Sequence, residues 1–161
     1  MITVAILTVS DGVAAGVRDD RSKEAIEESL KDVECEILYR AVVPDEKDKI
    51  AAKLTEWCDV NRVDLVLSTG GTGFAPRDVT PEAMRMVIQR EAPGLGEAMR
   101  AATLPKVPTA MLSRAIAGIR NRTLIVSLPG SPKGCTECME VILPVLPHGI
   151  SLLKGETGSH G

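Results

Sequence analysis

The chain has 161 residues, a mass of 17.1 kDa and a formal net charge of −3, which fits one domain able to bury a hydrophobic core. Aromatic residues make up only 2% of the chain and the basic residues are scattered, so we expect no nucleic-acid-binding surface. The apolar N-terminal stretch has no basic flank and is too short to span a bilayer, which predicts a cytoplasmic protein without membrane attachment.

The N-terminal half of the chain alternates predicted strands and helices. Apolar, β-branched runs predict buried strands at residues 2–9, 36–43 and 63–67. Apolar residues at helical spacing predict a helix with Ser22 as its N-cap between the first two strands, and a second helix after Pro44. This order is typical of βαβ units.

The C-terminal half continues with less regular spacing. Thr80 is the predicted N-cap of a third helix, and residues 95–102 predict a short fourth one. Residues 111–119 and 123–128 predict two extended stretches that pair as a hairpin, before a final helix that Pro144 should kink. The whole pattern predicts an α/β fold: a three-layer αβα sandwich with a mainly parallel sheet and one antiparallel strand.

We expect a single domain over residues 1–161, with an ordered core at about 1–154 and a tail at 155–161.

Cys135 and Cys138 have the spacing of a zinc-binding pair, but no second pair accompanies them and both fall on the apolar stripe of the last helix. Core packing is therefore the favoured interpretation. His148 and His160 are poor metal-ligand candidates, because the first lies in a proline-flanked helical segment and the second in the Gly-rich tail.

Ligands of open parallel sheets bind outside the carboxyl ends of the strands, so the residues after each strand are the candidates for binding. Gly70, Gly71 and Gly73 follow the third strand and allow consecutive amides to cradle a phosphate, as does the helix start at Ser131. A turn that needs glycine only for steric reasons explains the same glycines equally well. The turn lacks the spacing of a P-loop or a dinucleotide-binding fingerprint.

Two acidic residues lie near these turns. Capping of the following helix is the favoured explanation for Asp45 alone. Asp78 has no evident local role, apart from pairing with Arg77 or Arg85. A carboxylate beside phosphate cradles repels its ligand unless a hard cation such as Mg²⁺ lies between them. Together, Asp45 and Asp78 suggest metal-assisted phosphoryl or nucleotidyl transfer.

The stretch from Gly70 to Ala83, GGTGFAPRDVTPEA, closely resembles the molybdopterin adenylyltransferase family of MogA, MoaB and the gephyrin G domain. Further segments match in order: residues 8–11, 20–22, 43–46, 111–114, 117–120 and 128–132. The resemblance implies a MogA/MoaB-like three-layer fold, commonly a homotrimer, that binds molybdopterin and ATP. It also implies transfer of AMP from Mg-ATP to the terminal phosphate of molybdopterin, with release of pyrophosphate, before a metal-inserting protein of molybdenum cofactor biosynthesis receives the product.

The resemblance places the family's essential acids at Asp45 and Asp78, which we expect to be catalytic and to bind Mg²⁺ together with the nucleotide. It implies substrate or nucleotide binding at Ser10, Asp11, Asp20, Gly70, Gly71, Thr72, Gly73, Ser113, Pro129, Gly130 and Ser131. Two alternatives remain: a non-catalytic pterin-binding or scaffold member of the family, and an unrelated nucleotide-binding enzyme that uses the same crevice. The presence of both acids favours the enzyme.

Overall fold

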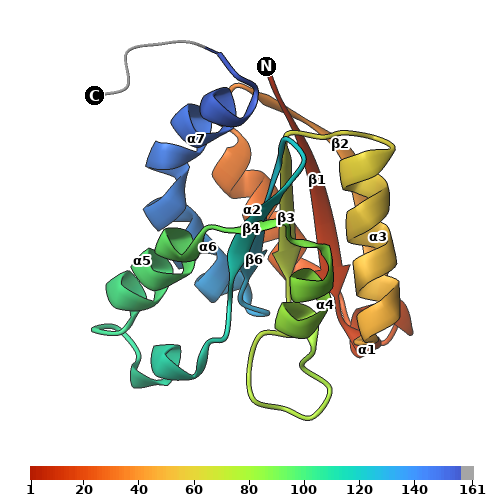
Figure 1. Cartoon of the computed structure of the whole chain (residues 1–161). Coiled ribbons are helices and arrows are strands. Elements are labelled where there is room, and N and C mark those ends of the chain that lie inside the picture. The colour runs from red at the N-terminus through yellow and green to blue at the C-terminus, as the bar shows by residue number, and fades with distance from the viewer. Residues whose placement is uncertain (157–161) are drawn as a thin grey trace.

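The computed structural model describes residues 1–156, which form a six-stranded sheet between two layers of helices (Figure 1). The strands lie in the order β2-β1-β3-β6-β5-β4. Their bounds are β1 Ile2–Val9, β2 Cys35–Val43, β3 Leu65–Thr69, β4 Arg90–Glu91, β5 Ala117–Arg120 and β6 Thr123–Leu128. Within the described residues only β5 runs against its neighbours, and the other strands share one direction. The predicted fold class, including one antiparallel strand, is confirmed.

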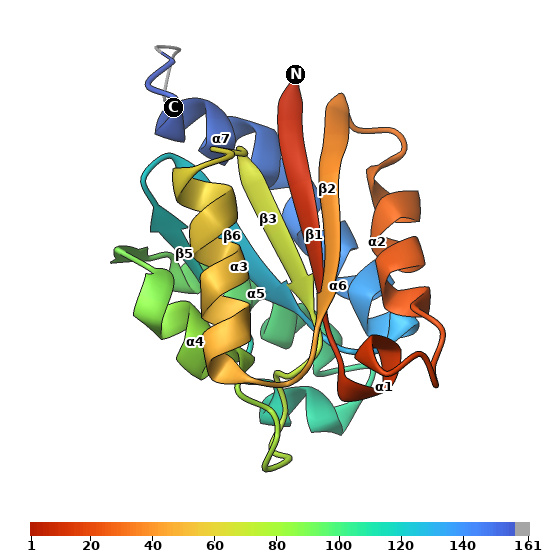
Figure 2. The same cartoon turned by 90° about the vertical axis from the view of Figure 1, so that its right-hand side faces the viewer.

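The helices divide between the two faces of the sheet. Figure 2 shows α3 and α4 on one face and α2, α5, α6 and α7 on the other. The helical elements are α1 Asp11–Ala14, α2 Arg21–Leu30, α3 Lys47–Asp59, α4 Thr80–Val87, α5 Pro93–Thr103, η1 Pro108–Leu112, α6 Pro132–Ile142, η2 Leu143–Val145 and α7 Leu146–Leu153, where η denotes a 3-10 helix.

Strand β1 illustrates why the sheet is covered on both faces. Successive side chains of a strand point to opposite sides, and here both sides are apolar. Val4 and Ile6 lie in the core with α2 and α6, whereas Ala5 and Leu7 lie in the core with α3 and α4. All four are fully buried. Burying one Ile or Leu side chain contributes about 1.5–3 kcal/mol, so this strand anchors both layers.

The start of α2 differs from the sequence-based prediction. Asp20, not Ser22, is the N-cap, and its Oδ1 accepts a hydrogen bond from the Lys23 amide at 3.2 Å. Ser22 lies inside the helix, where its hydroxyl donates to the Gly130 carbonyl at 2.9 Å. The prediction of Ser22 as the cap was wrong because Asp20 also provides a capping oxygen and lies closer to the end of the preceding loop.

Thr80 also has a different role from the one predicted. The residue before α4 is Val79, which makes no side-chain cap, and the Thr80 hydroxyl donates to the Gly70 carbonyl at 2.9 Å. This bond fixes the glycine turn against the helix.

The predicted extended stretch 111–119 was partly wrong because η1 occupies residues up to Leu112, with Pro108 at its first position, where a fixed φ suits a helical turn. The hairpin of β5 and β6 is confirmed.

The final helical run breaks at Pro144 into α6, η2 and α7, as the sequence predicts. Within the described residues, the run 132–153 is the one helix long and apolar enough to cross a membrane by length and composition alone. One side of it is buried against the sheet, through Cys135, Cys138, Met139, Ile142, Leu146 and Ile150. This packing is that of an amphipathic run that covers one face of the sheet. The tail predicted at 155–161 lies mostly outside the described residues, as does His160.

Candidate functional site

Two adjoining cavities open at the carboxyl edge of the sheet. The larger, of about 620 Å³, lies among α5, η1, the start of α6 and the β3–α4 loop. The smaller, of about 240 Å³, lies among the ends of β1 and β3 and the start of α2. Gly71, Asp78 and Gly130 line both cavities. This is the strand-end crevice in which ligands of parallel sheets bind.

All predicted site residues except Asp11 line one of these cavities. The larger cavity is lined by Gly71, Thr72, Gly73, Asp78, Ser113, Pro129, Gly130 and Ser131. The smaller one is lined by Ser10, Asp20, Asp45, Gly70, Gly71, Asp78 and Gly130. The fold therefore brings together residues from separate stretches of the sequence, and their individual contacts define what each can do.

The glycine turn after β3 has a strict steric requirement. Gly70 and Gly71 have φ angles of 99° and 69°, in the left-handed region that favours glycine. A Cβ at Gly70 would lie 2.2 Å from the Val9 carbonyl oxygen, and one at Gly71 would lie 2.3 Å from the Thr80 hydroxyl. The same turn leaves the amides of residues 71–73 without an acceptor among the described residues. The glycines of this turn are therefore required for steric reasons, and the turn also offers main-chain amides that could bind a phosphate.

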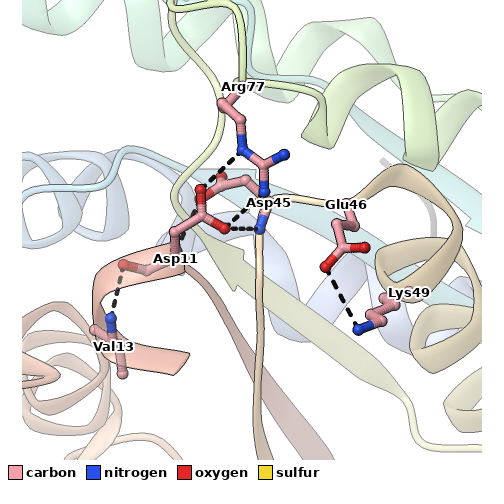
Figure 3. A network of polar contacts seen from close by, with 7 residues as sticks. Asp11, Val13, Asp45, Glu46, Lys49 and Arg77 are labelled. Carbon is pink, nitrogen blue, oxygen red and sulfur yellow. Dashed lines mark hydrogen bonds and ion pairs between the residues drawn. The ribbon is translucent and has the colours of Figure 1, made fainter. Parts of the chain in front are cut away.

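Asp45 lies just after β2 and is held by Asp11, the first residue of α1. Its Oδ2 accepts a hydrogen bond from the Asp11 amide at 2.9 Å, and its own amide donates to Asp11 Oδ1 at 3.0 Å (Figure 3). The N-cap of α3 is Glu46, without a side-chain bond, so capping does not explain Asp45. Burial raises the pKa of Asp45, and the charges of Asp11 and Asp78 raise it further.

Arg77 pairs with Asp11. Its Nε and Nη2 donate to the two carboxylate oxygens of Asp11 at 2.9 and 2.8 Å, as Figure 3 shows. These bonds hold the pKa of Asp11 below its usual range. The pair joins the β3–α4 loop to the start of α1. Asp11 consequently lies beside the smaller cavity and positions Asp45, rather than forming the wall.

Asp78 has a local role that the sequence-based interpretation missed. Its Oδ2 accepts a hydrogen bond from the Ala75 amide at 3.0 Å and so closes the turn over residues 75–78. It pairs with neither suggested arginine, because Arg77 binds Asp11 and Arg85 binds Glu91 at 3.1 Å. The absence of a Cβ at Gly73 leaves room for the same carboxylate oxygen, which a Cβ would approach to 2.9 Å.

Arg114 holds the loop that carries Asp78. Its guanidinium donates to the carbonyls of Gly73 and Asp78 at 2.8 and 2.7 Å and pairs with Glu82 at 2.6 Å. Its main-chain amide also donates to the Thr72 carbonyl at 2.8 Å. In the sequence, this arginine stands out only as part of a segment that matches the family. Nothing in a single sequence distinguishes it from an ordinary basic loop residue.

Several predicted binding residues also cap helices. Ser10 accepts from the Val13 amide at 3.2 Å and begins α1, and Ser131 accepts from the Gly134 amide at 3.0 Å and begins α6. Asp20 caps α2 and accepts from the Thr8 hydroxyl at 2.6 Å. These side chains therefore face the cavities from helix N-termini, where main-chain donors favour anions.

Basic residues in the cavity walls were not predicted. Arg100, Lys106 and Lys133 line the larger cavity, and Arg18 and Arg21 line the smaller one. They come from separate elements and so form no run in the sequence. Their charges favour anionic ligands such as phosphates.

The cysteine pair of the last helix is part of the core, as predicted. Cys135 and Cys138 are buried, and burial raises the pKa of each thiol to about 11. Cys135 Sγ donates to the Pro129 carbonyl at 3.1 Å. Across residues 1–156, no three His, Cys, Asp or Glu side chains gather in a way that would hold a metal ion. A structural zinc site at this pair is therefore unsupported.

Residues 5–148 match the family model described as a probable molybdopterin binding domain. The chain belongs to this family. It is 46% identical over 156 residues to a molybdopterin adenylyltransferase of Helicobacter pylori, covering 96% of this chain and 89% of that protein. A molybdopterin adenylyltransferase of Escherichia coli is 41% identical, with coverage of 92% and 80%. The relatives thus include enzymes of molybdenum cofactor biosynthesis.

The fold comparison agrees. The solved structure of the molybdopterin biosynthesis enzyme MoaB from Thermus thermophilus matches with a TM-score of 0.92 and 52% sequence identity, covering 96% of this chain and 98% of that one. The resemblance recognised in the sequence is therefore confirmed. Sequence identity of 52% over almost the whole chain excludes the alternative of an unrelated nucleotide-binding enzyme that shares only the architecture.

Proposed function

We propose that this protein is a molybdopterin adenylyltransferase, which transfers AMP from Mg-ATP to the terminal phosphate of molybdopterin. The observation that carries the proposal is the shared wall of the two cavities, where Asp78 stands beside the free amides of the glycine turn. Two adjoining cavities suit a reaction that joins two substrates. The names of the relatives indicate molybdopterin as the acceptor and an adenylyl group as the group transferred, and ATP as its donor is part of our proposal.

The reaction needs no covalent enzyme intermediate. An oxygen of the pterin phosphate attacks the α-phosphorus of ATP, a new P–O–P bond forms, and the bond to the leaving pyrophosphate breaks. The main work of the protein is to position two phosphates and to offset their charge. The amides of Gly71, Thr72 and Gly73 are the donors that we assign to phosphate binding, with the start of α6 at Ser131 as a second set.

The carboxylates suit magnesium. Asp45 Oδ1 and Asp78 Oδ1 accept no hydrogen bond from the described residues, while the other oxygen of each is fixed by a main-chain amide. The raised pKa of Asp45 reflects burial and crowded negative charge, which a cation would offset. Mg²⁺ commonly binds through one or two carboxylates together with substrate phosphates, whose charge it neutralises. We therefore assign Asp45 and Asp78 to hold it.

We extend the proposal to the surroundings of the reaction. The family resemblance suggests a homotrimer in the cytoplasm that passes adenylylated pterin to a metal-inserting protein. Light scattering of the purified protein tests the assembly, for which we expect a mass three times that of the 17.1 kDa chain. A monomer at working concentration would contradict this part alone.

The activity is tested with purified protein, anaerobic molybdopterin, Mg²⁺ and ATP, by following pyrophosphate and adenylylated pterin together. We expect both products in equal amounts and only when the pterin is present. Tight pterin binding without turnover would favour a scaffold function instead. Pyrophosphate release that is independent of the pterin would contradict the proposed acceptor.

A further inference from the structure

Glu137 lies in the wall of the larger cavity and is not explained by the assignments above. It comes from α6, and only 14% of its side chain is exposed. Its Oε2 is buried and receives no hydrogen bond from any described residue. Its ion-pair partner is Lys106, whose Nζ lies 3.3 Å from that oxygen.

This arrangement leaves one oxygen of the carboxylate, Oε2, short of donors. An ionised carboxylate has about four acceptor positions, and burying it without hydrogen bonds is costly. The Lys106 side chain is 58% exposed, so water competes with Glu137 for its ammonium group. A ligand that brought two N–H donors to Glu137 would satisfy the carboxylate better than the lysine alone.

The surroundings of Glu137 suit a flat ring. Near α5 and η1 the cavity wall has apolar surface from Met99, Val107 and Leu112 beside polar side chains such as Arg100 and Lys106, and Cys138 adds apolar surface on the same helix as Glu137. A volume of about 620 Å³ falls in the range of small-molecule sites, which combine apolar walls with a few placed polar groups. The cavity also reaches Asp78 and Gly130, where the phosphates are assigned.

The two proposed substrates carry different ring edges. A pterin has a 2-amino-4-oxo pyrimidine edge, with an N–H of the ring beside an amino group, so it presents two adjacent donors. Adenine presents an amino donor beside a ring nitrogen that accepts, and a carboxylate would repel that nitrogen. A carboxylate accepts only, so it fits the pterin edge and rejects the adenine edge.

We propose that Glu137 is the residue that selects the pterin ring, by accepting hydrogen bonds from its 2-amino-4-oxo edge in the larger cavity. This inference rests on the proposed function, because the relatives' names supply the pterin. Glu137 recognises the ring of the substrate, whereas Asp45 and Asp78 are assigned to the chemistry at the phosphates.

The test uses two stable probes, pterin-6-ylmethyl phosphate and the matching lumazine phosphate, whose ring carries an oxo group in place of the 2-amino group. Fluorescence titration measures their binding to the wild-type protein and to Glu137→Gln. We expect the wild type to prefer the pterin. The amide of Glu137→Gln can donate to the oxo group, so the variant should bind the pterin about 10- to 100-fold more weakly and lose or reverse the preference.

Two control variants separate ring recognition from local packing. Lys106→Met removes the ion pair but keeps the carboxylate, and we expect it to retain the pterin preference. Glu140→Gln changes an exposed acid on the same helix, and it should behave as the wild type. Circular dichroism and the melting temperature establish that each variant is folded.

The outcomes distinguish this inference from the proposed function. If the wild type adenylylates molybdopterin but Glu137→Gln keeps the full pterin preference, the role of Glu137 is wrong and the activity stands. If Lys106→Met loses the preference as strongly as Glu137→Gln, the ion pair is structural and the inference is overturned. If the wild type neither binds the pterin probe nor turns over molybdopterin, both proposals fail.

Discussion

Asp11 and Asp45 bind each other's main-chain amides, at 2.9 and 3.0 Å, although 34 positions separate them in the sequence. This reciprocal pair ties the loop after β1 to the loop after β2. Two carboxylates at such close range repel, and Arg77 offsets the repulsion by binding Asp11 through two hydrogen bonds. Asp45 keeps its raised pKa nonetheless. The ionised form of Asp45 is therefore disfavoured in the fold, because burial outweighs the hydrogen bond from the Asp11 amide.

The variant Asp45→Asn tests whether the ionised carboxylate of Asp45 destabilises the fold. A carboxyl with a raised folded-state pKa destabilises the fold once pH rises through that pKa, so its neutral amide should raise the melting temperature at pH 7 by a few degrees at most. The amide oxygen can still accept from Asp11. The gain should vanish at low pH, where Asp45 is itself protonated. Turnover should be lost. A melting temperature unchanged or lowered at pH 7 would contradict the electrostatic argument.

A second prediction concerns Arg114. The variant Arg114→Lys keeps the charge but loses the fork that binds the Gly73 and Asp78 carbonyls, so the loop carrying Asp78 should loosen. We expect a stability loss of about 1–2 kcal/mol and a fall in kcat of about tenfold or more. Urea unfolding and steady-state kinetics measure the two effects.

Glu82→Gln is the matched control for Arg114. It weakens the ion pair but leaves both carbonyl bonds in place. Its kcat should stay close to that of the wild type. A control variant as impaired as Arg114→Lys would mean that the ion pair, rather than the loop clamp, matters.

A third prediction concerns the glycine turn. Gly71→Ala puts a Cβ 2.3 Å from the Thr80 hydroxyl at a φ of 69°, so the turn must shift. The left-handed conformation alone costs a side chain about 1–2 kcal/mol, and displacing Thr80 adds to it. Gly149→Ala is the control, since its Cβ meets nothing within 4 Å and alanine favours the helix. We expect a lower melting temperature for the first variant and an equal or higher one for the second.

Some parts of this fold follow from local sequence. Strands β1 and β6 have the predicted bounds, 2–9 and 123–128, because each is a buried apolar run that no competing pattern interrupts. The two-residue strand β4 has no such signal, since Arg90 and Glu91 are both exposed. The cap of α2 was misplaced because Asp20 and Ser22 both carry capping oxygens.

The candidate site also contains residues with a clear sequence signal and residues with none. Its glycine turns and acids could be proposed from the sequence because they occupy one long family signature and the loops after successive strands, and the structure places them beside the two cavities. Glu137 and Arg114, to which we assign roles, have no signal in the sequence, because those assignments rest on contacts between distant segments, such as residue 106 with α6 or residue 114 with the loop at 73–78. Burial and unmet hydrogen bonds identify such residues, and a sequence displays neither.

Asp78 is the residue on which the proposed adenylyl transfer depends most, and Asp78→Asn is the decisive variant. The amide oxygen can still accept from the Ala75 amide, so the turn should persist and the melting temperature should change little. Adenylylated molybdopterin and pyrophosphate are measured with Mg²⁺, ATP and the pterin, beside the wild type. We predict a folded variant that still binds the pterin but forms at least about 100-fold less product. A folded Asp78→Asn protein with full turnover would show that this carboxylate does not serve the reaction.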